Sequence, residues 1–342
     1  MKWKKYSRTV LSLSGVIIFA IILYLGGTEA LSRVAHGDPV YLFATLLVIG
    51  GITLIGSLRW RLLVSALTRQ PPLPVRQIYH YNIIGRFISL FAPRGVGDFA
   101  ARPLALRTGG GSSLGIAVYS TLLDRMFDYI LLVLLVVPAL LYVARIVSIE
   151  VGTFLSLTVV VVFFFIVSNH FGQVIRWLNK IMGKIAILGN RFHFLGNIFS
   201  QERVNRFQQL ENIEVDKRTA GSAYLLSVLQ ISLIILRSYL IGLALGIDLP
   251  YMLLLLASPI AQLGQLLAFT PGALGFRELG WYSVLQASGI PTEDLLTFLV
   301  GHRAYIYFCI MVLALISQVI TFIRPAPIRS LPPVTEAEQQ ET

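Results

Sequence analysis

The chain has 342 residues, of which 56% are hydrophobic and 13% are charged, and its mean hydropathy is +0.74. Soluble domains carry about a quarter charged residues, so this composition excludes an ordinary soluble protein and indicates a polytopic membrane protein. Basic residues outnumber acidic ones by 28 to 17. We attribute this excess to cytoplasmic loops and not to a nucleic-acid partner. The single cysteine, Cys309, excludes an intramolecular disulfide.

Long apolar runs predict an all-α protein with six full membrane spans. The basic start, MKWKK, also suits a signal peptide, but no clean cleavage site follows it, so we expect an uncleaved first helix. The six predicted spans cover residues 9–27, 40–58, 112–145, 151–168, 219–246 and 291–323.

The segments outside the spans are polar or proline-rich. The loop 169–218 contains RWLNKIMGKIAILGNRF, which would suit an amphipathic helix on the anionic inner leaflet. A plain solvated loop is the alternative. Residues 324–342 are rich in proline and polar residues, and we expect a disordered cytoplasmic tail there.

Two further apolar stretches are broken by proline and glycine. Each stretch is too short to cross the bilayer twice, so we expect two re-entrant helical hairpins. The limbs are 77–92 with 98–108 and 251–270 with 276–288, and the breaks contain Pro93, Gly95, Gly97, Pro271, Gly272 and Gly275.

The two broken regions resemble each other. A shift of 178 residues aligns six identical pairs without a gap, and most of them are helix breakers or intramembrane arginines. A weak internal repeat of this kind is typical of transporters. The pairs are Phe91 with Phe269, Pro93 with Pro271, Gly97 with Gly275, Gly111 with Gly289, Arg125 with Arg303, and Tyr129 with Tyr307.

The distribution of basic residues predicts the orientation. With both termini inside the cell, 19 lysines and arginines are cytoplasmic and two, Arg33 and Arg145, are outside. Three full spans separate the hairpins, so the hairpins enter from opposite faces and form an inverted repeat. We expect one integral domain, 1–323, in the cell membrane, with repeat units 77–145 and 251–323 and a cytoplasmic loop 169–218.

The breaks predict an anion site. Irregular backbone survives at membrane depth only where protein buries it or where it lines a wet cavity. Each break precedes a short helical limb, whose free N–H groups and positive dipole end favour an anion. The alternative is that the breaks only allow a tight turn.

Charged residues in the apolar segments support an anionic ligand. A central arginine facing lipid costs roughly 2.5–3.5 kcal/mol, so these side chains must pair, snorkel or face water. The arginines exceed the acids by three, and an anionic ligand would balance that surplus. The set is Arg86, Arg94, Arg102, Arg125, Arg237, Arg277 and Arg303 with Asp98, Asp124, Asp128 and Glu278.

Arg125 and Arg303 lie deepest, about 18–20 Å along their helices at 1.5 Å per residue. Arg125 has Asp124 and Asp128 nearby in sequence, so a structural ion pair is an alternative to ligand binding. Arg303 has no acid within one turn, and either Glu278 or the substrate must be its partner. Arg86 and Arg237 could be ordinary snorkelling residues.

Two regions of the chain resemble the signature regions of the lysylphosphatidylglycerol synthase transmembrane family. The first contains FAPRGVGDFAARPLAL and STLLDRMFDYILLVLL, and the second contains AFTPGALGFRELGWYSVLQASGI and HRAYIYF. The resemblance extends over residues 10–323. Ala273 stands where that family usually has glycine, and Asp98 stands where glutamate is common. The resemblance implies a lipid-translocating membrane domain. In members with a second, soluble domain, that domain makes the aminoacylated lipid. No such domain fits here, so we expect no synthase activity. Together with the charges and breaks above, we expect the substrate-binding residues to be Arg94, Gly97, Asp98, Arg102, Arg125, Arg277, Glu278 and Arg303.

No catalytic or metal-binding motif occurs in the chain, so we expect a transporter without cofactors and not an enzyme. The first hypothesis is a flippase-like translocator of an anionic or aminoacylated phospholipid, or of a lipid-linked phosphate. The alternative is a membrane accessory of a glycosyltransferase acting on polyprenyl-phosphate-linked sugars. A second copy of the chain, or that glycosyltransferase, would then be its protein partner.

Overall fold

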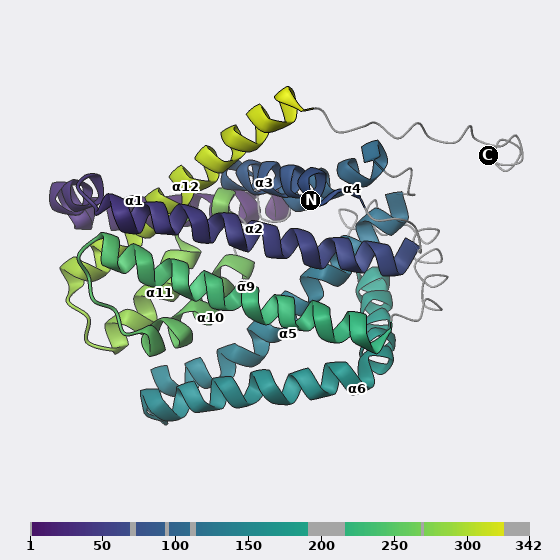
Figure 1. The fold of residues 1–342 in the computed structure, drawn as a ribbon. Coiled ribbons are helices and arrows are strands. Elements are labelled where there is room, and N and C mark those ends of the chain that lie inside the picture. The colour runs from purple at the N-terminus through teal and green to yellow at the C-terminus, as the bar shows by residue number, and fades with distance from the viewer. Residues whose placement is uncertain are drawn as a thin grey trace, which may run out of the picture.

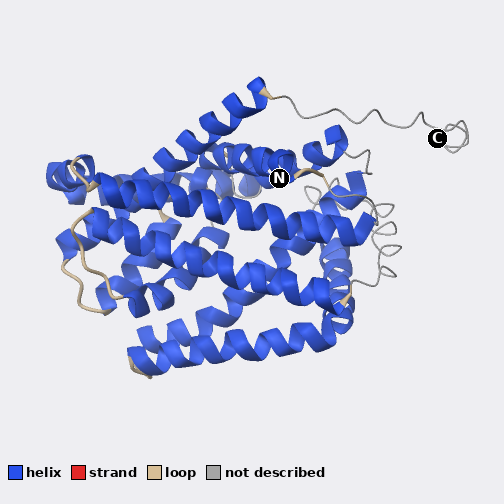
Figure 2. Cartoon of the chain, viewed as in Figure 1, coloured by secondary structure: helices blue, strands red, loops and turns tan. Residues whose placement is uncertain are grey.

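The computed structural model describes residues 2–68, 73–92, 96–109, 114–190, 216–267 and 270–324. Throughout these residues the protein is helical, without strands (Figures 1 and 2), which confirms the all-α prediction. The helices are α1 Lys2–Ala35, α2 Pro39–Thr68, α3 Val75–Phe91, α4 Val96–Gly109, α5 Leu114–Val143, α6 Ile149–Asn190, α9 Lys217–Ala244, α10 Tyr251–Leu267, α11 Phe276–Ala287 and α12 Thr292–Ile323, with a 3₁₀ turn, η2, at Pro271–Ala273.

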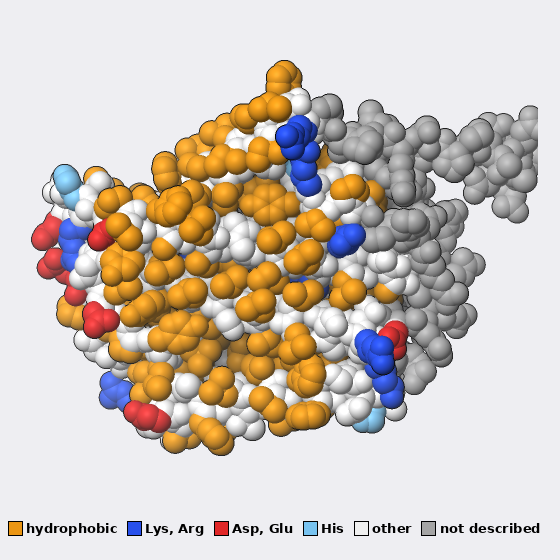
Figure 3. Space-filling model, viewed as in Figure 1, with side chains coloured by type: hydrophobic (Ala, Val, Ile, Leu, Met, Phe, Trp, Pro, Cys, Tyr) orange, Lys and Arg blue, Asp and Glu red, His pale blue; other side chains and the backbone are white. Residues whose placement is uncertain are grey.

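Six helices in the described residues are long and apolar enough to cross a membrane, as predicted. They are α2, α9 and α12, together with the apolar parts of α1, α5 and α6, and their mean hydropathy lies between 1.6 and 2.5. Large apolar side chains such as Phe154 and Leu315 are exposed on the outside. In Figure 3 hydrophobic side chains form a broad band, and charged ones gather mainly at its two ends. The protein is therefore a multi-pass membrane protein.

Helix α2 is longer than predicted. The sequence placed the end of this span at residue 58 and counted Arg59 among cytoplasmic residues. The helix instead continues to Thr68, and the Arg59 side chain is fully buried. The next prolines lie at 71, 72 and 74, and proline rather than charge ends the helix. The positive-inside asymmetry remains without Arg59.

Helix α6 extends well beyond its apolar part. It bends at His170, whose backbone is not helical (φ −121°, ψ 22°), and continues to Asn190. The first part of the predicted cytoplasmic loop is therefore helical. Residues 191–215 and the predicted tail beyond 324 lie outside the described residues.

The two predicted hairpins are pairs of short helices. Helices α3 and α10 have 17 residues each, and α4 and α11 have 14 and 12. At 1.5 Å per residue none is longer than about 26 Å, which falls short of the hydrocarbon core. Helix α3 packs against α4, and α10 packs against α11. Re-entry into the bilayer stays a prediction.

The two breaks touch each other. The N–H of Gly272 in the second break donates to the carbonyl of Ala92 at the end of α3, at 3.2 Å. The Tyr307 hydroxyl of α12 donates to the Leu90 carbonyl at 3.5 Å. The second break turns through left-handed backbone at Gly272 (φ 57°), Ala273 (φ 57°) and Gly275 (φ 82°). Glycine adopts this conformation without strain, so Ala273 is the strained position of the three.

Hydrogen bonds place the hairpin starts at opposite ends of the bundle. Arg76, at the start of α3, donates to the carbonyl of Ile320 near the end of α12 at 2.8 Å. Helix α10 follows the end of α9, where the Asp38 N–H donates to the Ala244 carbonyl at 2.9 Å. Arg33 at the end of α1 pairs there with Asp294 at the start of α12, at 2.9 Å.

The sequence placed Gly97 in the break, but it is the second residue of the helical limb that follows. It lies within α4, and its φ is not positive. A Cβ atom on Gly97 would overlap the backbone oxygen of Gly85 in α3 and the Ser89 hydroxyl. Gly97 therefore lets the two limbs of the first hairpin approach closely.

We expect Gly97→Ala to lower the free energy of unfolding by about 1–3 kcal/mol, because overpacking against backbone forces the two helices apart. Gly50→Ala is the matched control, since its Cβ would make only ordinary contacts, with the Tyr79 hydroxyl at 3.8 Å and a Leu313 methyl at 3.9 Å. Thermal unfolding in detergent checks both variants. An unchanged melting temperature for Gly97→Ala would contradict the close-packing role.

Candidate functional site

A cavity of about 190 Å³ lies where the two hairpins meet α5, α9 and α12. The first hairpin contributes residues of its α3 limb, and the second contributes Gly272 of its break. Its polar and charged lining residues are Arg86, Ser89, Arg125, Asp128, Tyr129, Gln230, Arg237, Gln262, Gln265, Arg277, Arg303 and Tyr307.

The lining is strongly basic. Of the described residues, five arginines and a single acid, Asp128, line the cavity, with three glutamines and two tyrosines. Guanidinium groups and amides donate hydrogen bonds, so the cavity wall has many more hydrogen-bond donors than negatively charged acceptors. Charge interactions are stronger beside protein of low dielectric constant than in bulk water. The arrangement therefore favours an anion.

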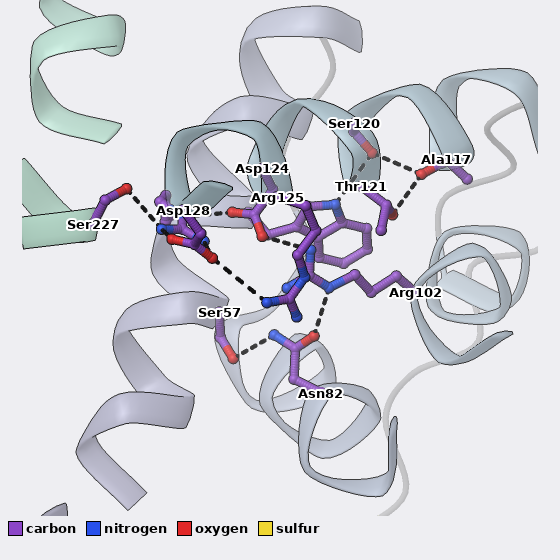
Figure 4. Close-up of polar contacts among 12 residues, drawn as sticks. Ser57, Asn82, Arg102, Ala117, Ser120, Thr121, Asp124, Arg125, Asp128 and Ser227 are labelled. Carbon is purple, nitrogen blue, oxygen red and sulfur yellow. Dashed lines mark hydrogen bonds and ion pairs between the residues drawn. The ribbon is translucent and has the colours of Figure 1, made fainter. Parts of the chain in front are cut away.

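Asp124 of α5 is the centre of one buried ion network beside the cavity (Figure 4). Its carboxylate accepts from Arg59 Nε and from Arg102 Nη1, both at 2.6 Å. Asp124 and Arg59 are fully buried, and Arg102 is 3% exposed. Arg102 also donates to Asn82 at 3.1 Å. The network thus ties both limbs of the first hairpin to α2 and α5.

Asp128 lies one turn further along α5. It accepts from Arg59 at 2.5 and 2.9 Å, in the two-pronged geometry that guanidinium and carboxylate favour. Ser227 of α9 accepts from the same guanidinium at 2.7 Å. Arg125, considered as the ion-pair partner of these acids, reaches Asp128 only at 3.5 Å. The main partner is therefore Arg59.

A second ion network holds the second hairpin to α12. Arg303 donates to Glu278 at 2.8 and 2.5 Å, and both side chains are buried. Glu278 was one of the two partners proposed for Arg303. The Arg303 guanidinium also donates to the carbonyls of Gly272 at 2.6 Å and Ala273 at 3.3 Å. Arg303 thus stabilises the left-handed break.

The start of α11 is not open to an anion in the way the sequence predicted. The Gly275 N–H donates to the Glu278 carboxylate at 2.8 Å, which caps the helix from within. Glu278 therefore performs the capping role and the ion-pair role at once. At this helix start an anion would have to compete with the Glu278 carboxylate.

Arg237 of α9 has a different environment. It is 7% exposed and lines the cavity, and the charges of Arg86 and Arg277 act on it. Its Nε is buried and has no hydrogen-bond partner among the described residues. A buried charge without compensation is costly. Arg237 is therefore a lining residue that an anion in the cavity would stabilise.

The predicted site residues separate into three groups. Arg125, Arg277, Arg303 and Gly272 line the cavity. Arg102, Glu278, Gly97 and Gly275 lie behind it in ion pairs or in packing. Pro93, Arg94 and Gly95 lie outside the described residues, as do the side chains of Asp98 and Pro271.

Some cavity residues were missed or undervalued. Arg86 and Arg237 were interpreted as possible snorkelling residues, and the three glutamines were not considered. Ser227, Gln230 and Arg237 are spaced by three and seven residues within an apolar span. That spacing places polar groups on one helix face and was a readable signal.

The sequence matches the family profile described as "Lysylphosphatidylglycerol synthase TM region" over residues 11–314. The chain belongs to this family. It is also similar to two proteins of Methanothermobacter thermautotrophicus, each named "UPF0104 membrane protein". One is 24% identical over 89% of this chain and 90% of the relative. The other is 22% identical over 82% of this chain and 83% of the relative. The family resemblance drawn from the motifs is thus confirmed.

Proposed function

We propose that this protein moves a phosphate-bearing lipid headgroup between the two leaflets through the cavity between its hairpins. The observation that carries the proposal is a basic cavity in a membrane protein, lined by residues of both hairpins and of α5, α9 and α12. The headgroup enters the cavity while its chains stay in the bilayer. Charged groups in a membrane are expensive and typically mark such a pathway.

The ends of the bundle support an orientation with both termini cytoplasmic in the cell membrane. Glu293 and Asp294 lie with Arg33 at one end, which the charge count places outside. The start of α3 lies with the end of α12 at the opposite end. Hairpins that begin at opposite ends also suit alternating access from the two leaflets.

We expect the purified protein in liposomes to scramble a fluorescent phospholipid labelled on its acyl chain. Ile234→Trp should reduce the rate strongly, because Ile234 lines the cavity and a larger side chain fills it. The measurement is the fraction of label that a membrane-impermeant quencher reaches over time.

Leu225→Trp is the matched control, since Leu225 lies on the same helix and is 54% exposed. Its rate should equal that of the parent protein. Equal rates in empty liposomes and in liposomes with folded protein would contradict translocation. That outcome would favour the alternative of an accessory to a glycosyltransferase.

A further inference from the structure

We infer that the cavity binds a terminal phosphate monoester, and not an aminoacylated or zwitterionic headgroup. This inference rests on the proposed function and narrows the headgroup to a chemical class. It follows from the charge balance of the cavity, from its size, and from the environment of Arg237.

The charge balance comes first. Seven buried or cavity-lining arginines face three acids in the described residues, which leaves four positive charges. Asp124, Asp128 and Glu278 are already bound by Arg59, Arg102 and Arg303. The surplus therefore lies on the cavity side. The seven arginines are Arg59, Arg86, Arg102, Arg125, Arg237, Arg277 and Arg303.

The charge of the ligand follows from this surplus. A phosphate monoester carries about −1.5 to −2 near neutral pH and has three terminal acceptor oxygens. Several guanidinium forks can share these oxygens in two-pronged hydrogen bonds. A phosphodiester carries one charge and offers fewer free oxygens. An aminoacylated headgroup adds ammonium groups to a cavity that already has excess positive charge, and like charges repel.

The size of the cavity points the same way. At about 190 Å³ it lies below the roughly 300–1,000 Å³ of pockets for drug-sized ligands. It therefore accepts a small charged group and not an extended headgroup. Leucine and isoleucine side chains, such as Leu132 and Ile306, complete the wall. An apolar wall beside a basic one suits the phosphate of a lipid better than a free phosphate.

Arg237 identifies the position of the phosphate. Its Nε lacks a partner, and its neighbours Arg86 and Arg277 repel it. A phosphate among these three arginines would accept from Arg237 and offset that repulsion. Loss of one partner in a buried, hydrogen-bonded charge pair typically weakens binding on the order of 30-fold or more.

The test compares binding of phosphatidic acid, phosphatidylglycerol, lysyl-phosphatidylglycerol and inorganic phosphate to the purified protein in detergent. We expect phosphatidic acid to bind about tenfold more tightly than phosphatidylglycerol, because it carries the extra charge. Arg237→Gln should lose that preference, Arg237→Lys should retain part of it, and Arg145→Gln, an exposed site outside the cavity, should be unchanged.

A stability readout separates this role from a structural one. Without ligand, Arg237→Gln should melt at the same temperature as the parent or higher, because it removes an uncompensated buried charge. A large fall in melting temperature without ligand would overturn the inference. Equal or tighter binding of phosphatidylglycerol or lysyl-phosphatidylglycerol would also overturn it.

The remaining arms identify the source of the phosphate. If phosphatidic acid binds more tightly than inorganic phosphate, the site is assigned to a lipid. Inorganic phosphate binding equally well at the same site assigns it to a free phosphate, and either result supports the monoester chemistry. Binding without scrambling would overturn the proposed function alone. Scrambling without a preference for phosphatidic acid would overturn this inference alone.

Discussion

Asp124→Asn should destabilise the protein by about 3–5 kcal/mol, which is the usual effect of removing one member of a buried ion pair. Asp124 is fully buried and accepts from both Arg59 and Arg102 at 2.6 Å. Asparagine has nearly the same shape but no charge, so two buried guanidinium groups would lose their shared partner. The free energy of unfolding in mixed micelles measures the effect.

Two further variants test the cause of that loss. Asp128→Asn should lower the free energy of unfolding by less, because the Asp128 side chain is 19% exposed and Arg59 would still be paired with Asp124. Adding Arg102→Gln to Asp124→Asn should recover part of the stability, since one uncompensated charge is removed. A free energy of unfolding for Asp124→Asn within about 1 kcal/mol of the parent value would contradict this role. Water or another group would then have to satisfy both arginines.

Much of the helical arrangement follows from the sequence because lipid imposes a strict rule. Backbone groups must be satisfied within helices, and side chains facing lipid must be apolar. Hydropathy therefore predicted all six spans, and the proline and glycine breaks predicted the limits of the short helices to within a few residues. The pairing of Arg303 with Glu278 was among the alternatives, because no acid lies within one turn of Arg303.

The depth of Arg59 could not be predicted in the same way. The sequence RWR after an apolar run looks like the basic end of a span. The depth of Arg59 depends on where α2 ends, and the end of α2 depends on how the helix packs against its neighbours. Trp60 and Leu63 are fully buried against neighbouring helices, so the helix continues and carries Arg59 inside. Tertiary contacts of this kind leave no periodic signal in the sequence.

Gly97 and Gly275 show another limit of sequence reasoning. They align in the predicted repeat, yet Gly275 has a φ of 82° and Gly97 has ordinary helical backbone. Gly275 has a backbone conformation that other residues rarely adopt. Gly97 instead leaves space for a neighbouring helix. One residue type thus meets two different needs, and the sequence alone does not distinguish them.

Glu278→Gln should lower the free energy of unfolding by about 3–5 kcal/mol, because it leaves Arg303 buried without its carboxylate. Glu278 accepts from Arg303 at 2.8 Å and from the Gly275 N–H at 2.8 Å. Glutamine can still accept one of these hydrogen bonds, so the loss is mainly electrostatic. Arg303→Gln should cost a similar amount, because it leaves Glu278 charged and buried. Thermal and denaturant unfolding in detergent measure both variants.

The double variant Glu278→Gln with Arg303→Gln should be more stable than either single variant, since no unpaired charge remains. Tyr307→Phe is the matched control, because it leaves the ion pair intact and removes only the hydroxyl, which accepts from Arg303 at 2.8 Å and donates to the Leu90 carbonyl at 3.5 Å. It should cost about 0.5–1.5 kcal/mol. Arg303 would instead act chiefly on the ligand if Arg303→Gln kept full stability and lost phosphate binding. That pattern is the one expected of Arg237, and comparing these two arginines distinguishes the residue that stabilises the break from the one that binds the phosphate.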